Sequence, residues 1–526
     1  MSSFDKLVLV VVVAQAIFAL FKRISGQGNR REVAKALDQA PATDDVERWR
    51  TVLAIRLQVM GEALAELAVR GAQGEQVLVR TGEVGRLLLG VLRDRLQPER
   101  AACEQAVAAL GRRLAAAEPL ELFVQLEQSG EVGRLVERVA RLTRAIEAVA
   151  SQAAWRGDPA LREVIGDAEA IAVALLAPIR QFADAHGLRL PVGRPVCAPG
   201  TGEEAVWYDL LPGHPVIRVP DDFGEDLLRW PSVAHEIGHL LWWGLPGLAG
   251  ELRQLVPTAS RPWLPRAQGR QVTFDLEAAF AHWLPELIAD GFAAMMLGPA
   301  ALRGLAQSLG RPDDPGAVAR LHAAPDGQTL TPHAPPHLRV ALSAWLVERM
   351  GFLTEAEAVR RAWDRAHGAP ELLWSPTLGG EQVPLPVVRF RIFGQQLLER
   401  FYTGTYASFA GYPLSAVTGL EMSPGTWARV QRRAQDLLAD TPFNDDPRLV
   451  IAAGIEAAVA KPGNEVRISQ GVRRAVQGIG LDEGLVADAH YAGREAGGGR
   501  LTAADIRDAI VLDALFGRRR AHQGQR

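Results

Sequence analysis

VAHEIGHLLWW, residues 233–243, is the stretch that most constrains the fold of this chain. Pro231 suits the first turn of a helix and Gly244 suits its end, so the sequence predicts a helix of about three turns between them. On such a helix His235 and His239 lie four residues apart on one face, with their imidazoles converging on a common point. The apolar residues around them predict that this helix is held in a core.

The two histidines have the spacing of a metal-binding pair. Imidazole nitrogens so placed reach a zinc ion at about 2.0–2.1 Å without distortion of the backbone. Glu236 projects beside them, where it can hold a water molecule rather than the metal. The alternative is that His235 and His239 are ordinary polar residues of a core helix, because a short motif also occurs by chance.

A catalytic zinc needs a third protein ligand and an open fourth position. The segment FDLEAAFAHWLPELIADGFAAMMLGP, residues 274–299, predicts a second helix and offers Glu286 as that ligand. Asp290 follows one turn later on the same face, where a carboxylate can accept the outer N–H of a ligating histidine. His282 is the rival ligand, but no acid accompanies it in this way. Pro285 is predicted to start or kink the helix.

Three motifs in this order resemble those of the gluzincin metallopeptidases, thermolysin among them. HEIGH at 235–239 followed by ELIAD at 286–290 looks most like the HtpX and CAAX prenyl protease group, whose second motif is E-x-E-A-D; here Ile288 replaces the middle Glu. HAPPHLR at 333–339 is similar to the downstream His-Pro…Arg element of that group, with alanine in place of the proline. The similarity spans residues 206–350 and is specific for a zincin core but not for a substrate.

The resemblance implies both a cofactor and roles for individual side chains. The cofactor is Zn2+, and the implied ligands are His235, His239 and Glu286. Glu236 is implied as the general base. His333, or alternatively His337, is implied to stabilise the oxyanion, with Arg339 supporting the site. The membrane members of the family have several spanning helices, which this sequence lacks, so intramembrane processing is not implied.

Length and composition indicate a folded protein of two or three domains. The chain has 526 residues, of which 48% are hydrophobic and 23% charged. Its net charge of −3 gives no global field that would attract nucleic acid. The only cysteines are Cys103 and Cys197, which excludes a disulfide scaffold and a cysteine-rich metal cluster but leaves one bridge open. A cytoplasmic location is favoured.

An apolar run near the N-terminus raises the alternative that the chain is attached to a membrane. LVLVVVVAQAIFALF, residues 7–21, is shorter than the roughly 18–20 residues of a spanning helix, and Gln15 interrupts it. The basic residues after it would keep the rest of the chain in the cytoplasm if the segment entered a membrane. Membrane association, packing against protein and secretion stay open as alternatives, the last without a convincing cleavage site.

The sequence predicts a mainly α (α+β) fold in four parts. Residues 1–32 are the apolar segment and a linker. Residues 33–186 carry leucine, alanine, glutamate and arginine at three- and four-residue spacing, which is typical of a helical bundle or coiled-coil-like region, with a protein partner as an open alternative. A zincin-like core with a small antiparallel β element occupies 187–370. A helical extension with a basic tail follows at 371–526.

The β element is predicted from two runs that precede the motif helix. AVWYDL (205–210) and PVIRVP (215–220) are joined by a Leu-Pro-Gly-His turn, which is typical of a hairpin. The second run is expected to pair with an extended substrate by edge addition. By contrast, residues 371–386 are predicted to form a loop.

Together these features predict a zinc-dependent metalloendopeptidase that acts on an unidentified protein or peptide. One alternative is a non-catalytic helical scaffold that retains a structural or vestigial zinc site. Another is a zinc hydrolase that acts on a non-peptide amide.

Overall fold

The described part of the chain is mainly helical with small sheets, as predicted. The computed structural model describes residues 43–477, apart from 117–121, 123–125, 127–128, 189, 191, 201–203, 207–214, 221–222, 224–225, 257–265, 268–269, 272–273, 312, 323–329 and 377–381. The apolar run 7–21 and the basic tail lie outside these residues. Among the helices that are described, none is long and apolar enough to span a membrane.

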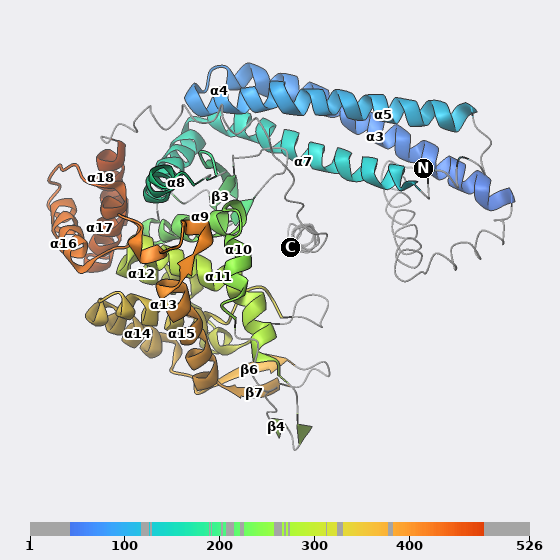
Figure 1. Cartoon of the computed structure of the whole chain (residues 1–526). Coiled ribbons are helices and arrows are strands. Elements are labelled where there is room, and N and C mark those ends of the chain that lie inside the picture. Colours follow the sequence, from blue (N-terminus) through green and yellow to red (C-terminus); the bar gives the residue numbers. More distant parts are fainter. Residues whose placement is uncertain are drawn as a thin grey trace. The chain divides into compact units, whose positions relative to one another are not determined.

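One unit of the chain comprises Met1–Ala72 and Arg93–Ile146. It takes in most of α3 (Thr43–Leu78), all of α5 (Gln97–Ala116) and the first half of α7 (Glu131–Gly157), which run alongside one another (Figure 1). A short π-helix, η1 (Leu92–Leu96), leads into α5. The buried positions of α3 recur every three or four residues, which is the stripe of an amphipathic helix: Leu53, Leu57, Met60, Leu64 and Leu67.

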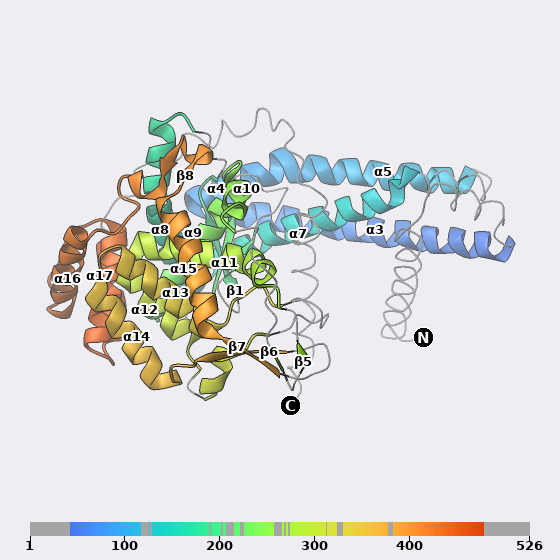
Figure 2. The ribbon, with the colours of Figure 1, turned by 60° about the horizontal axis from the view of Figure 1, so that its bottom comes forward.

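The second unit comprises Gln73–Leu92 and Glu147–Arg526 and holds all of the residues predicted for the site. Its central helix is α11, which contacts α9, α12, α13 and α15 (Figure 2). The helices of this unit, besides the ends of α3 and α7, are α4 (Gly82–Val91), α8 (Pro159–Ala185), α9 (Pro231–Gly244), α10 (Leu248–Arg253), α11 (Leu276–Leu297), α12 (Pro299–Leu309), α13 (Pro336–Arg349), α14 (Leu353–His367), α15 (Val387–Thr403), α16 (Pro424–Leu438), α17 (Pro447–Ala460) and α18 (Glu465–Gln477).

A three-stranded sheet precedes α9. Its strand order is β1 (Val196–Gly200), β3 (Val216–Pro220), β2 (Glu204–Val206), with β2 antiparallel and β1 parallel to the central strand. The antiparallel pairing of β2 with β3 confirms the direction predicted for the two runs. The expectation that 215–220 accepts a substrate at its edge is wrong, because β3 has a partner on both sides and no free edge.

Three small hairpins complete the β structure. Within the segment 371–386, β6 (Leu372–Pro376) pairs in full with β7 (Gln382–Pro386) and the two strands form one of these hairpins. The loop prediction for this segment is therefore wrong. Prolines are tolerated in this hairpin because both of its strands are edge strands. A proline whose nitrogen faces away from the partner strand removes no hydrogen bond of the ladder. The other hairpins pair β4 (Arg266–Ala267) with β5 (Arg270–Gln271) and β8 (Thr405–Tyr406) with β9 (Tyr412–Pro413).

The two helices that carry the site cross at very close range. At Gly238 on α9, an added Cβ would lie 2.6 Å from the Cα of Ala289 on α11. Only glycine therefore permits this approach. The ends of α11 are fixed locally: Asp275 accepts a hydrogen bond of 2.8 Å from the N–H of Ala278, and Gly298 follows the last turn with φ of 58°. Pro285 lies inside α11 and does not start it.

A buried polar cluster ties β1 to the helices behind it. Glu169 on α8 binds Arg156 of α7 and also accepts a 3.0 Å hydrogen bond from the N–H of Cys197. Gln152 donates a 2.7 Å hydrogen bond to the carbonyl of the same cysteine. Both Cys103 and Cys197 are free and buried, so no bridge joins them.

Candidate metal centre

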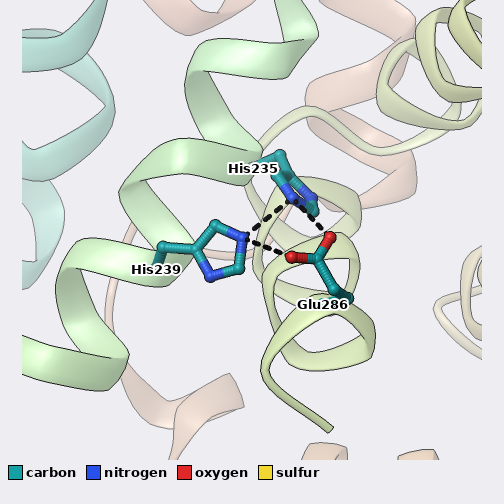
Figure 3. Close-up of side chains that lie close together, drawn as sticks. All are labelled: His235, His239 and Glu286. Carbon is teal, nitrogen blue, oxygen red and sulfur yellow. Dashed lines mark hydrogen bonds and ion pairs between the residues drawn. The ribbon is translucent and has the colours of Figure 1, made fainter. Parts of the chain in front are cut away.

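Three side chains from α9 and α11 converge on one point. The Nε2 atoms of His235 and His239 are 3.1 Å apart. The carboxylate of Glu286 reaches both rings, with one oxygen 3.2 Å from Nε2 of His239 and the other 3.4 Å from Nε2 of His235 (Figure 3). All three ligand atoms lie within 4.8 Å of one another. The side chains that the sequence predicted as a ligand set are thus brought together.

These separations fit a tetrahedral metal ion. Two ligands at about 2.0–2.1 Å from a tetrahedral zinc are about 3.3–3.4 Å apart. The Nε2–Nε2 distance of 3.1 Å lies close to that value, and each imidazole nitrogen lies at 3.2 or 3.4 Å from a different oxygen of the Glu286 carboxylate. Two imidazoles and one carboxylate also form a donor set that zinc accepts. The residues therefore fit a metal ion, although they do not identify which one.

Asp290 fixes the orientation of His235. It lies one turn beyond Glu286 on α11 and accepts a 2.8 Å hydrogen bond from Nδ1 of His235. Arg339 of α13 donates two further bonds to the same carboxylate, of 2.8 and 2.7 Å. Because the outer nitrogen of His235 is held in this way, its Nε2 is directed toward Glu286 and His239.

The electrostatics of the group are dominated by its buried charges. Burial alone would lower the pKa of His235, but hydrogen bonds to Asp290 and Glu286 outweigh it and raise that pKa to about 10. Burial would raise the pKa of Glu286, yet neighbouring histidines, His239 first among them, hold it well below its ordinary value. Burial would also raise the pKa of Asp290, but the charge and hydrogen bonds of Arg339 outweigh this effect and lower that pKa. Both carboxylates are therefore ionised at neutral pH.

His239 is held less firmly than its partner. Its Nδ1 atom is buried and has no hydrogen-bond partner within the part of the chain that the structure describes. The indole of Trp243, one turn further along α9, stacks on the imidazole with centroids 5.3 Å apart and planes at 15°. Trp243 is 49% exposed, whereas Trp242 and Trp283 belong to the core. On its outer side the second histidine is thus positioned by packing, whereas His235 is held there by a hydrogen bond.

The remaining predicted residues lie around this group. Glu236 is buried beside the two histidines on α9, with 5% exposure. His333 is half exposed, and its Nε2 lies 3.4 Å from an oxygen of Glu286. Arg339 approaches the same oxygen to 3.6 Å. Burial would lower the pKa of Arg339, but Asp290 and two other carboxylates raise it.

The two alternatives named with these residues fall outside the group. His337 is buried in the first turn of α13 and accepts a hydrogen bond of 3.3 Å from the indole N–H of Trp363. No hydrogen bond or ion pair joins His337 to the three ligands among the described residues. His282 is exposed on α11 and is not one of the converging side chains.

Sequence reasoning did not identify the contribution of Gly238 or Trp243. The signal for Gly238 is a glycine inside a helix that otherwise has good helix formers, which usually marks a close approach. Nothing in the local sequence separates the exposed Trp243 from the buried Trp242 before it.

Comparisons with known proteins give no match. No family model matches the chain, and neither a curated protein nor a solved structure resembles it significantly.

Substitution of Asp290 by Asn is expected to weaken metal binding about 10- to 100-fold, because the amide neither balances Arg339 nor polarises His235 as a carboxylate does. The measurement is a competition titration against a zinc-binding dye. Asp275→Asn is the matched control, since asparagine caps a helix as well as aspartate and this residue is far along α11 from the ligands. Equal affinity in Asp290→Asn and the wild type would contradict the assigned role.

Zinc affinity is also expected to rise with pH. With a pKa of about 10 in the metal-free protein, His235 carries a proton at pH 6–8, and that proton must leave before the ring can bind a metal. The apparent association constant should increase about tenfold for each pH unit over this range. Calorimetry in buffers of different ionisation enthalpy would count the protons released. An affinity independent of pH would show that His235 has no proton to release at pH 6–8 and would contradict its raised pKa.

Proposed function

We propose that this chain is a zinc-dependent metallopeptidase with His235, His239 and Glu286 as its metal ligands. The observation that carries the proposal is the convergence of these donors at 3.1–3.4 Å on two crossing helices. The carboxylate–histidine pairing behind the group supports it, because ligating histidines characteristically have such partners. The likeness of the three motifs to the gluzincin metallopeptidases, and hence a zincin-like core, belongs to the same proposal.

The protein's own groups have roles in this reaction that follow from their positions. When zinc is held by the three ligands it supplies Lewis acidity, which lowers the pKa of a water toward 7 and polarises a carbonyl. Glu236, adjacent to the first ligand on α9, accepts the proton of the attacking water and later delivers it to the leaving amine. Its burial keeps bulk water from solvating the carboxylate, which favours proton transfer.

Two basic side chains are available for the oxygen that becomes negatively charged. His333 is half exposed and lies 3.4 Å from a Glu286 oxygen, so in the proposed reaction its N–H would donate to the oxygen that becomes negatively charged. Arg339 is already engaged by Asp290 and acts as a positioning residue for His235. An oxyanion donor of this kind is worth about 3 kcal/mol. An extended peptide would pair with β2, which contacts α9 and has one partner among the described strands.

The proposal is tested by metal analysis and cleavage assay on the full chain. The expected result is about one zinc per chain, with cleavage in a broad peptide library that a chelator stops and added zinc restores. A chain that binds no metal would refute the proposal. A chain that binds one zinc and cleaves nothing would favour the alternative, a scaffold with a structural metal.

A further inference from the structure

A second polar site lies on α13, away from the metal ligands. Residues of three helices line a small pocket: His337 from α13, Arg360, Trp363 and Asp364 from α14, and Arg391 from α15. Its cavity volume is about 40 Å³. A cavity of about 10–15 Å³ on this measure holds one water, so the pocket has room for a group of a few heavy atoms.

His337 offers the pocket a hydrogen-bond donor. The side chain is 6% exposed, and its Nδ1 accepts the indole N–H of Trp363 at 3.3 Å. A nitrogen that accepts carries no proton, so the neutral ring has its hydrogen on Nε2. Burial, the largest influence, lowers the pKa of His337, which keeps the ring neutral. No hydrogen bond to Nε2 occurs among the described residues, so this N–H is available to a ligand in the pocket.

The charges that line the pocket favour an anion. Arg391 makes no ion pair or hydrogen bond with any other residue that the structure describes. Arg360 also lines the pocket and forms an ion pair with Glu348 at 3.3 Å. Asp364 is exposed and is the one carboxylate that lines the pocket. Two guanidiniums therefore oppose one carboxylate, and the lining carries a net positive charge.

We propose that this pocket binds a small oxyanion, a phosphate or a carboxylate group, between Arg391, Arg360 and the Nε2–H of His337. The donors match the ligand, because guanidinium groups bind both kinds of oxyanion through paired N–H···O hydrogen bonds. The imidazole N–H adds a further hydrogen-bond donor. The volume of about 40 Å³ suits one such group. The site requires nothing of the metal centre and does not depend on the proposed peptidase activity.

The experiment is calorimetric titration of the full chain, without added metal, with inorganic phosphate, and separately with acetate, at constant ionic strength. Saturable binding of one equivalent of at least one of the two anions is expected in the millimolar range or tighter. Arg391→Gln should weaken that binding at least about tenfold, the loss of one charge-assisted contact. Asp364→Asn should strengthen it about two- to fivefold, because the lining carboxylate repels an anion.

Arg365→Gln is the matched control, since this exposed arginine also lies on α14 but does not line the pocket. It should bind the anion as the wild type does. The expected changes in anion affinity have opposite signs in Arg391→Gln and Asp364→Asn. General destabilisation of the protein would weaken binding in both variants, so the two signs distinguish it from loss of a specific site. The absence of saturable binding of either anion by the wild type would overturn the proposal. Equal losses of anion affinity in Arg391→Gln and Arg365→Gln would also overturn it, because the anion would then bind elsewhere, for example at the metal centre.

Discussion

Replacement of Glu236 by Gln is expected to abolish the peptide hydrolysis proposed for this chain while the proposed metal site still binds zinc. The amide has the shape of the carboxylate but cannot accept a proton from water, and general base catalysis is worth about 10²- to 10⁴-fold in rate. Glu236 is buried beside the ligands without being one of the three converging donors, so metal content should not change. The measurements are kcat/KM on any peptide that the wild type cleaves and zinc content per chain.

A control and a contradicting result complete this test. Glu62→Gln alters an exposed carboxylate of α3, outside the unit that holds the site, and should leave both readings unchanged. Activity of Glu236→Gln within tenfold of the wild type would remove this residue as the general base. Loss of zinc together with activity would instead indicate that Glu236 holds the site together.

Substitution of Gly238 by Ala should damage both stability and metal binding. The new Cβ would lie 2.6 Å from the Cα of Ala289, and a backbone atom cannot move aside as a side chain can. The helices α9 and α11 must therefore separate, which costs about 1–3 kcal/mol of unfolding free energy as overpacking does. Separation also draws Glu286 away from the two histidines, so zinc affinity should fall at least about tenfold. Thermal unfolding and dye competition would measure the two effects.

The same substitution elsewhere provides the control. Gly166 lies in the middle of α8, and an added Cβ there meets no atom within 4 Å. Gly166→Ala should therefore stabilise the protein by up to about 1 kcal/mol through helix propensity and leave zinc affinity unchanged. If Gly238→Ala behaves like Gly166→Ala, the close crossing of α9 and α11 does not hold the ligands in place.

The predictable parts of this protein are those that depend on neighbours along the chain. The helix Pro231–Gly244 follows from its end residues, and the shared face of Glu286 and Asp290 follows from a four-residue spacing. Each places side chains within one helix. The three side chains that converge could also be chosen from the sequence, because metal ligation restricts the residue types and the second carboxylate favours Glu286 over His282.

The features that escaped prediction depend on contacts between distant segments. β1 pairs with β3 in parallel, and no local sequence pattern predicts this pairing. The hydrogen bonds between the two strands occupy the edge of β3 that was expected to be free. The hairpin β6–β7 was obscured by its prolines, which normally indicate a loop. The close distance between α9 and α11 depends on the contact of Gly238 with Ala289, and only the tertiary structure brings these two residues together.

The unequal anchoring of the two histidines bears on the order in which a metal enters and leaves. To swing away, His235 must first break its bond to Asp290, which Arg339 in turn holds in place. No such bond restrains the outer nitrogen of His239 among the described residues, and the indole of Trp243 stacks on that ring. We expect exchange to begin with His239, so that shrinking the indole by Trp243→Leu would hasten zinc dissociation more than it alters the equilibrium affinity.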